Sequence, residues 1–284
     1  MIKTIEPLDA GSREKLLRLE EIIVGLGSLA VGFSGGVDSS FLLQIAHELL
    51  GEKAIAVTAV DASLPERELK GAKEFCKDHG IEHVMFSFDP LQEEGYRQNS
   101  PDRCYFCKRI IFSEMIRIAG EHGIMYVAEG SNLDDLGDYR PGLRAINELS
   151  VKSPLMEAQM TKTDIRTISK AMGLPTWDKP AYACLASRFV YGEEITREKL
   201  RMIDQAEQFL TELGFYEERV RIHGNIARIE VPEKDIPKLA SEEIRHAIYE
   251  RFTQIGFMFV TIDVCGYRRG SMNATINSCN EKRK

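Results

Sequence analysis

Short apolar runs alternate with amphipathic stretches through the first half of the chain. The apolar runs predict β-strands at residues 29–33, 53–60, 82–88 and 125–128. Apolar residues at helical spacing predict helices at 12–27, 41–50, 65–79 and 106–122, with Gly80 and Gly123 placed to end the last two. This alternation predicts parallel β-α-β units, an α/β fold in which ligands bind at the carboxyl ends of the strands.

The pattern changes near residue 190. A helix at 161–172, capped by Thr161, precedes a segment at 174–188 that has no clear periodicity. Beyond it, we expect a helix at 196–213, a hairpin of strands 219–222 and 227–231, a helix at 233–254 and a strand at 257–264. The sequence therefore predicts two domains, a parallel α/β domain at 1–188 and a smaller α+β domain at 189–284.

Composition narrows the class of protein. The chain has 284 residues, 43% of them hydrophobic and 29% charged, which is ordinary for a globular protein. Its net charge of −7 counts against a nucleic-acid partner. No apolar run reaches the length of a membrane span and the start lacks the apolar core of a signal peptide, so we expect a cytoplasmic protein. In such a compartment, six cysteines argue against a disulfide framework.

The first predicted strand leads into Ser34, Gly35, Gly36, Asp38 and Ser39, which open a helix. The glycines allow the backbone to approach a bound group closely, and a helix N-terminus favours an anion. Asp38 cannot favour a phosphate by its charge, but it can hold Mg²⁺ against one. The Gly-x4-Gly-Lys spacing of the common phosphate loop is absent. The stretch resembles instead the pyrophosphate loop, Ser-Gly-Gly-x-Asp-Ser, of enzymes that cleave ATP, transfer AMP and release pyrophosphate; the alternative is a plain turn of small residues.

A second loop follows the fourth predicted strand, at the same edge of the sheet. It contains Ser131 and Asn132 in the run Gly-Ser-Asn-Leu-Asp-Asp, and its position predicts that it faces the nucleotide. Residues 138–142, which come next, are expected to form a mobile loop.

Three cysteines are candidates for metal chemistry. Cys104 and Cys107 form a Cys-x2-Cys pair on the loop that enters a predicted helix, where two thiols can converge on one metal or cluster. A redox pair, half of a zinc site and coincidence remain alternatives. Cys184 lies in the aperiodic segment and could also be a small buried apolar group. The other cysteines, Cys76, Cys265 and Cys279, are interpreted in that second way.

Taken together, the pyrophosphate loop, the Gly-Ser-Asn-Leu-Asp-Asp run and the motif Trp-Asp-Lys-Pro-x-x-Ala-Cys-Leu-Ala-Ser-Arg at 177–188 resemble the LarE family. The resemblance spans nearly the whole chain. It implies an ATP-dependent sulfur transferase in the biosynthesis of the nickel-pincer nucleotide, the cofactor of lactate racemase. Such enzymes adenylate a carboxylate of pyridinium-3,5-dicarboxylate mononucleotide and replace AMP with sulfur.

The resemblance also implies how the sulfur is supplied. In some members one cysteine, matching Cys184, gives up its own sulfur and becomes dehydroalanine; those members lack cysteines at 104 and 107. Other members have three cysteines that ligate a [4Fe–4S] cluster, and this sequence matches that pattern. Three ligands leave one iron open for a hydrosulfide, so Cys184 would be a ligand and not a consumed donor. The resemblance further implies a sulfide donor and a homo-oligomer, expected to be a hexamer.

Several cations could bind the substrate phosphate or carboxylate. Arg188 comes shortly after Cys184 and would lie near the cluster, with a surface ion pair as the alternative. Arg268 and Arg269 form a second candidate clamp. His223, in the predicted hairpin turn, is expected to be structural.

Three other functions compete with sulfur transfer. An amide ligase of the NAD or GMP synthetase type would use the same loop with ammonia, but it would leave the cysteines unexplained. A tRNA thiolase predicts a basic face, which a net charge of −7 does not favour. A non-catalytic nucleotide-binding module is disfavoured by Asp38, which supplies a metal position.

Overall fold

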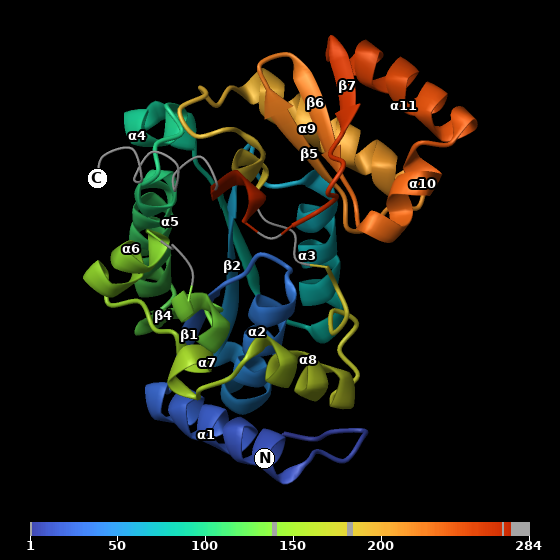
Figure 1. The fold of residues 1–284 in the computed structure, drawn as a ribbon. Coiled ribbons are helices and arrows are strands. Elements are labelled where there is room, and N and C mark those ends of the chain that lie inside the picture. The colour runs from blue at the N-terminus through green and yellow to red at the C-terminus, as the bar shows by residue number, and fades with distance from the viewer. Residues whose placement is uncertain (1, 138–140, 181–183, 269, 274–284) are drawn as a thin grey trace, which may run out of the picture. The chain divides into compact units, whose positions relative to one another are not determined.

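The computed structural model describes residues 2–137, 141–180, 184–268 and 270–273 (Figure 1). The chain forms two compact units. The first comprises Met1–Asp61, Arg67–Phe88 and Cys104–Tyr182. The second comprises Ala62–Glu66, Asp89–Arg103 and Ala183–Lys284.

A four-stranded parallel sheet is the centre of the first unit. Its strands are β1 (Leu29–Gly32), β2 (Ala54–Val60), β3 (His83–Ser87) and β4 (Tyr126–Ala128), in the order β3-β2-β1-β4. Strand β1 pairs with two neighbours: Leu29 lies opposite Ala54 of β2 and opposite Tyr126 of β4. The predicted α/β fold with a parallel sheet is confirmed.

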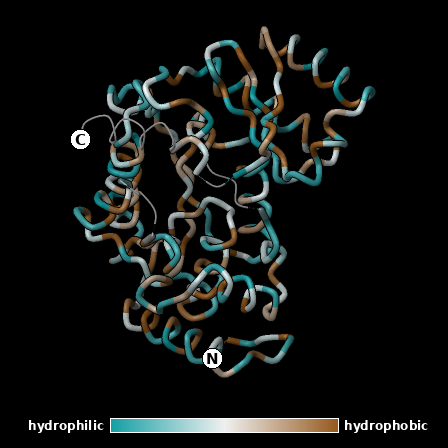
Figure 2. Tube along the Cα trace, viewed as in Figure 1, coloured by the Kyte–Doolittle hydropathy of each residue, from teal (hydrophilic) through white to brown (hydrophobic). Residues whose placement is uncertain are grey.

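Helices cover both faces of this sheet because successive strand residues point to opposite sides. Leu29 and Val31 face a core formed with α1 (Ala10–Leu26), α2 (Val37–Leu50), α3 (Glu66–His79) and α8 (Lys162–Ala171). Ala30 faces a second core formed with α5 (Arg103–Glu121) and α6 (Gly142–Glu148). A short helix, α7 (Pro154–Glu157), lies on the first side. Hydrophobic and hydrophilic positions alternate along these helices, as expected for helices with one buried face (Figure 2).

The second unit contains a smaller sheet. Its strands β5 (Arg219–His223), β6 (Ile226–Glu230) and β7 (Phe259–Ile262) lie in that order. β5 and β6 are antiparallel and form the predicted hairpin, whose turn includes Gly224 at a φ of 61°, whereas β6 and β7 are parallel. The helices of this unit are α4 (Glu94–Arg97), α9 (Arg197–Glu212), α10 (Ile236–Leu239) and α11 (Glu242–Ile255).

One predicted helix of the second unit is wrong. The helix expected at 233–254 is divided into a 3₁₀ turn, α10 and α11. Ser241 takes an extended conformation with a ψ of 151° and becomes the N-cap of α11, ahead of two glutamates in the first turn. Serine followed by acidic residues is a start signal for a new helix, which interrupts the continuous periodicity.

The units are interleaved along the chain. Two loops, Ala62–Glu66 and Asp89–Arg103, leave the first sheet after β2 and β3 and belong to the second unit. The single boundary that the sequence predicts after residue 188 remains a prediction. Across the described residues, no helix is both long enough and apolar enough to span a membrane.

Candidate functional site

The loop between β1 and α2 is organised by the hydroxyl of Ser39. The backbone N–H of Ser34 donates to Ser39 Oγ at 3.3 Å, and the two serine hydroxyls are 3.2 Å apart. Ser39 Oγ in turn donates to the carbonyl oxygen of Gly36 at 3.2 Å. Gly35 has a φ of 70°, a left-handed conformation that glycine adopts without strain. The loop therefore holds its shape through contacts among its own residues.

This loop is suited to an anion. Gly36 is the N-cap of α2 and contributes no side chain to the cap. The first N–H groups of a helix have no acceptor within the helix, and the helix dipole favours negative charge at that end. A phosphate at this position would be met by backbone donors.

Asp38, in the first turn of α2, fits a divalent cation. Its Oδ2 accepts from Lys162 Nζ at 2.5 Å. Its Oδ1 is buried and has no hydrogen-bond partner among the described residues. A buried carboxylate oxygen without a donor is costly, and oxygen ligands of this kind are those that Mg²⁺ prefers. Asp38 therefore retains an open ligand position.

A second lysine reaches the loop from another segment. Lys179 Nζ donates to the carbonyl oxygen of Gly35 at 2.9 Å and forms an ion pair with Glu68 Oε2 at 2.8 Å. Neither Lys162 nor Lys179 was predicted from the sequence as a site residue. Both had a local signal: Lys162 directly follows the capping residue Thr161, and Lys179 lies within the motif at 177–188.

The loop after β4 lies against the same helix start, as predicted. A Cβ on Gly130 would lie only 3.1 Å from the backbone nitrogen of Ser39, a tight contact that glycine avoids. Ser131 Oγ donates to Glu129 Oε2 at 2.7 Å, and the backbone N–H of Asn132 donates to Asp135 Oδ2 at 3.1 Å. Both residues are buried and shape the loop; their contact with a nucleotide remains a prediction.

The candidate metal ligands are divided between the units. Because α5 begins at Arg103, Cys104 and Cys107 lie in its first turn and not on the preceding loop. Residues three apart share a helix face, so both thiols point from one side of α5. Cys104 is exposed and Cys107 half-buried. Cys184, in the second unit, is exposed, and its Sγ donates to Ser63 Oγ at 3.0 Å. Within the described part of the chain, no three Cys, His, Asp or Glu side chains form a ready metal site.

The remaining cysteines have different surroundings. Cys76 is buried, and burial raises the pKa of its thiol to about 12, which suits an inert apolar role. Cys265 is exposed. Cys279 lies outside the described residues.

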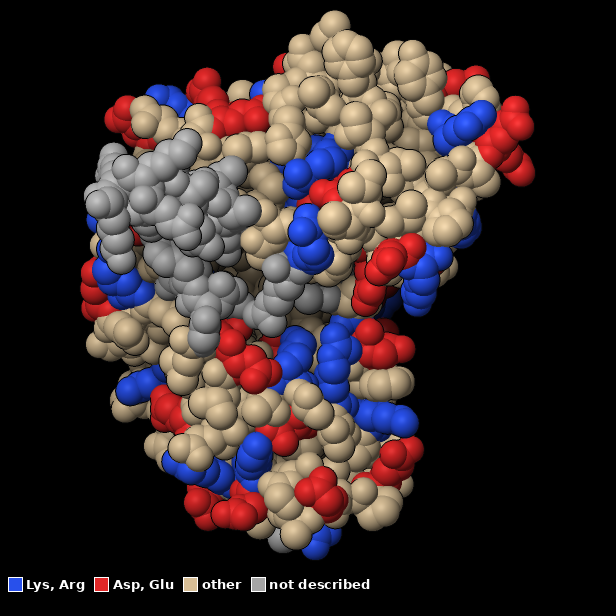
Figure 3. Space-filling model, in the orientation of Figure 1, with Lys and Arg blue, Asp and Glu red and all other residues tan. Residues whose placement is uncertain are grey.

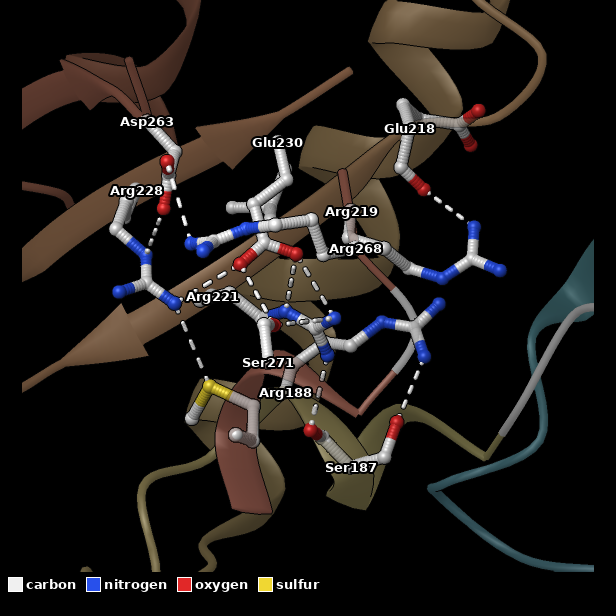
Figure 4. A network of polar contacts seen from close by, with 12 residues as sticks. Ser187, Arg188, Glu218, Arg219, Arg221, Arg228, Glu230, Asp263, Arg268 and Ser271 are labelled. Atoms are coloured by element: carbon white, nitrogen blue, oxygen red, sulfur yellow. Dashed lines mark hydrogen bonds and ion pairs between the residues drawn. The ribbon is translucent and has the colours of Figure 1, made fainter. Parts of the chain in front are cut away.

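Arg188 does not form the surface ion pair considered as its alternative role. It is fully buried, and its Nε and Nη2 donate to the two carboxylate oxygens of Glu207 at 2.7 and 2.9 Å. Burial lowers the pKa of the guanidinium, but the charge of Glu207 outweighs this and raises it overall. Its Nη1 also donates to Ser187 Oγ at 2.8 Å (Figure 4).

Two arginines that were not predicted from the sequence as site residues lie on the sheet of the second unit. Arg221 and Arg228 both bind the buried carboxylate of Glu230, at 2.9 Å each (Figure 4). Their regular alternation with apolar residues on β5 and β6 could have revealed a polar face of the sheet. Arg268 is one half of the expected phosphate clamp, and its Nη2 lies 3.9 Å from Asp263 Oδ1. Arg269, the other half, lies outside the described residues.

The hairpin residue His223 is half-buried. Burial is the main cause that lowers its pKa, with a further contribution from Arg228. This is in keeping with the structural role expected for it. Over the face shown in Figure 3, basic and acidic side chains are intermixed.

Comparison with known proteins agrees with this geometry. The family model described as NAD synthase matches residues 15–108, which include the loop between β1 and α2. The chain is 35% identical to the pyridinium-3,5-bisthiocarboxylic acid mononucleotide synthase of Lactiplantibacillus plantarum, over 88% of this chain and 91% of that protein. The chain belongs to the family of this synthase. The resemblance to LarE noted in the sequence is thereby confirmed, as is the pyrophosphate-loop fold.

Two uncharacterized proteins are also similar to this chain. An uncharacterized protein of Synechocystis sp. is 40% identical over 92% of this chain and 98% of its own length. An uncharacterized protein of Methanocaldococcus jannaschii is 30% identical over 84% of this chain and 90% of its own length.

Proposed function

We propose that this protein is an ATP-dependent sulfur transferase that adenylates the carboxylates of pyridinium-3,5-dicarboxylate mononucleotide and converts them to thiocarboxylates, a step in nickel-pincer nucleotide biosynthesis. The observation that carries the proposal is the loop at the carboxyl edge of the sheet, where Asp38 keeps a buried carboxylate oxygen that no described residue contacts by a hydrogen bond, beside the α2 N-terminus. The relationship to the bisthiocarboxylic acid mononucleotide synthase supports the substrate and product.

The proposed first step activates a carboxylate, which is a poor electrophile because its leaving group would be oxide. Attack of the carboxylate oxygen on the α-phosphorus of ATP forms an acyl adenylate and releases pyrophosphate. Backbone N–H groups of the loop would bind the pyrophosphate, and Asp38 would hold Mg²⁺, which neutralises the charge that grows on the leaving group. Lys162 and Lys179 provide further positive charge beside the loop.

In the proposed second step, a sulfide attacks the acyl carbon and AMP departs, so the carboxylate oxygen is replaced by sulfur. Cys104, Cys107 and Cys184 would provide the donor set for a [4Fe–4S] cluster, since thiolates are the usual ligands of such clusters. When bound, the cluster would supply the sulfur. Cys184 would then serve as a ligand and remain intact.

Other predictions accompany this proposal. Arg188, Arg268 and Arg269 are candidates for binding the substrate phosphate, although the buried pairing of Arg188 with Glu207 favours a positioning role for that residue. A homo-oligomer, a separate sulfide donor and a cytoplasmic location remain predictions. The NAD synthase match keeps amide ligation as the competing function, since both reactions begin with an adenylate.

The test is a single-turnover reaction of anaerobically purified protein with ATP, Mg²⁺, the dicarboxylate mononucleotide and sulfide. Sulfur transfer predicts AMP, pyrophosphate and a thiocarboxylate product. A parallel reaction contains ammonium in place of sulfide, and formation of an amide in it would favour the ligase. Intact-protein mass separates the two sulfur sources. An unchanged mass supports ligation by Cys184, and conversion of residue 184 to dehydroalanine in step with product would overturn it.

A further inference from the structure

The contact between Lys162 and Asp38 places an ammonium group on the carboxylate that fits a metal. Lys162 Nζ lies 2.5 Å from Asp38 Oδ2, and the two side chains are 29% and 24% exposed. The other oxygen, Oδ1, is buried and lacks a hydrogen-bond donor in the described part of the chain. One oxygen of the carboxylate is thus satisfied by an internal cation while the other is not.

The backbone of Lys162 is fixed independently of this contact. Lys162 is the first residue of α8, which is held by a reciprocal capping box between Thr161 and Asp164. Its own N–H donates to Asp134 Oδ2 at 2.8 Å. With the backbone anchored at both points, only the flexible side chain of Lys162 is free to change partner.

We propose that Lys162 is an exchangeable cation: it neutralises Asp38 until a divalent metal arrives with ATP, and it then passes to the phosphate oxygens. The inference rests on the proposed function, because it assumes that Asp38 holds the metal of bound nucleotide. It adds a phosphate-contacting side chain and an order of events to that site.

The electrostatic reason is that the ammonium and the metal compete only when there is no phosphate. Two cations on one carboxylate repel each other, so Lys162 weakens the binding of a metal alone. The triphosphate brings several negative charges, and both cations then have partners. Lys162 should therefore oppose the metal alone but favour the metal–nucleotide complex.

Lys179 has a different role in this scheme. Its partners are the Gly35 carbonyl oxygen and Glu68, so it does not occupy a metal ligand. The competition is a property of Lys162.

The chain offers a close control for the test. Lys15 Nζ lies 2.5 Å from Asp164 Oδ2, an equally short lysine–aspartate pair at the start of the same helix. The two side chains are 33% and 18% exposed, similar to the pair under test. Replacing either lysine by methionine removes the charge and keeps most of the apolar stem.

The experiment measures two affinities by electron paramagnetic resonance of Mn²⁺ without any turnover. One is for Mn²⁺ alone, and the other is for Mn²⁺ with α,β-methylene-ATP. For Lys162→Met we expect binding of Mn²⁺ alone to tighten roughly two- to fivefold, because a partly exposed ion pair no longer competes. Binding of the nucleotide complex should weaken about tenfold or more, since a charged donor to phosphate is lost.

Control variants decide between the outcomes. Lys15→Met should change neither affinity, and Lys162→Arg should recover most of the nucleotide affinity. If Lys162→Met leaves the affinity for Mn²⁺ alone unchanged or weakens it, the proposed exchange of Lys162 between Asp38 and phosphate is wrong. The proposed function would still stand in that case if Asp38→Asn abolishes nucleotide binding. If Asp38→Asn binds Mn²⁺ and the analogue like the wild type, the metal position itself is wrong, and both proposals fall.

Discussion

Arg188 and Glu207 form a two-point ion pair that is closed off from solvent. The Nε–Oε1 distance is 2.7 Å, and each side chain is only 1% exposed. Glu207 also accepts the backbone N–H of Val220 at 2.9 Å, so its carboxylate joins the segment after Cys184 to α9 and β5. Burial raises the pKa of Glu207, but the charge of Arg188 outweighs it and lowers the pKa overall.

Removing one partner of this pair should destabilise the protein. Arg188→Met leaves the Glu207 charge buried without its main counter-ion, and we expect a loss of about 3 kcal/mol in the free energy of unfolding. The double variant Arg188→Met/Glu207→Leu should recover much of this loss because neither charge of the pair is then buried without the other. Urea unfolding followed by circular dichroism measures both. A single variant as stable as the wild type would show that water replaces the missing partner.

Substitutions in the pyrophosphate loop should separate chemistry from folding. Asp38→Ala should abolish ATP–pyrophosphate exchange in the presence of substrate, because the proposed metal ligand is lost, while the circular dichroism spectrum stays the same. Ser39→Ala should slow exchange by about fivefold, since its hydroxyl orders the loop through neutral hydrogen bonds worth roughly 1 kcal/mol.

Ser40 is the matched control for Ser39. It is the next residue of α2, fully buried, and its Oγ has no hydrogen-bond partner among the residues described. Ser40→Ala should therefore leave the exchange rate unchanged. Normal exchange in Asp38→Ala would place the metal elsewhere.

The cysteine substitutions test the cluster assignment. Cys104→Ala, Cys107→Ala and Cys184→Ala should each lower the iron content of anaerobically purified protein, because each removes one proposed ligand. Adenylation should persist, since the loop uses no thiol. Cys76→Ala and Cys265→Ala are controls and should retain iron. Full iron in any of the three variants would exclude that cysteine as a ligand.

The sequence predicted the central strands of the first sheet well because β1 and β2 are mostly buried and read as nearly unbroken apolar runs. Glycine and capping signals likewise placed the helix ends. Lys162 and Lys179 escaped prediction because their loop partners are 124 and 144 residues away in the chain. The local signals, a position after the cap Thr161 for Lys162 and a place in the 177–188 motif for Lys179, do not reveal which loop residue each lysine contacts.

Arg188 illustrates a different limit. Arginine is ordinarily exposed, and its burial depends on a carboxylate supplied by α9. Only the fold reveals that pairing.

The pH dependence of stability should contain a contribution from His83. Its Nε2 lies 2.8 Å from Thr58 Oγ1, which donates to the carbonyl oxygen of Phe33 at the base of the pyrophosphate loop. Burial, with a smaller effect of Lys73, lowers the pKa of His83 below its ordinary value of 6.5. As the pH falls, the imidazole of His83 is therefore protonated in the unfolded chain before it is protonated in the folded protein. The contribution of neutral His83 to stability is complete above about pH 6.5 and is lost as the pH falls through the pKa of the folded state.

Replacing the imidazole should flatten this dependence. We expect His83→Gln to lose less stability than the wild type between pH 7.5 and pH 5.5, as measured by urea unfolding at each pH. Equal losses in the two proteins would assign the acid sensitivity to other groups.

The two loops that leave the first sheet for the second unit limit which segments of the gene can be exchanged by recombination. Within that unit, Leu185 donates its N–H to Ser63 at 2.9 Å, Gly192 to Asn99 at 3.1 Å and Ile195 to Arg97 at 2.8 Å. Recombination between two related genes that exchanged only the last hundred or so residues would take the donors from one parent. The acceptors, which are encoded far upstream, would come from the other parent. The second unit is thus not encoded by one continuous stretch, and a change in the length or path of either loop would displace backbone acceptors that segments downstream of residue 183 use.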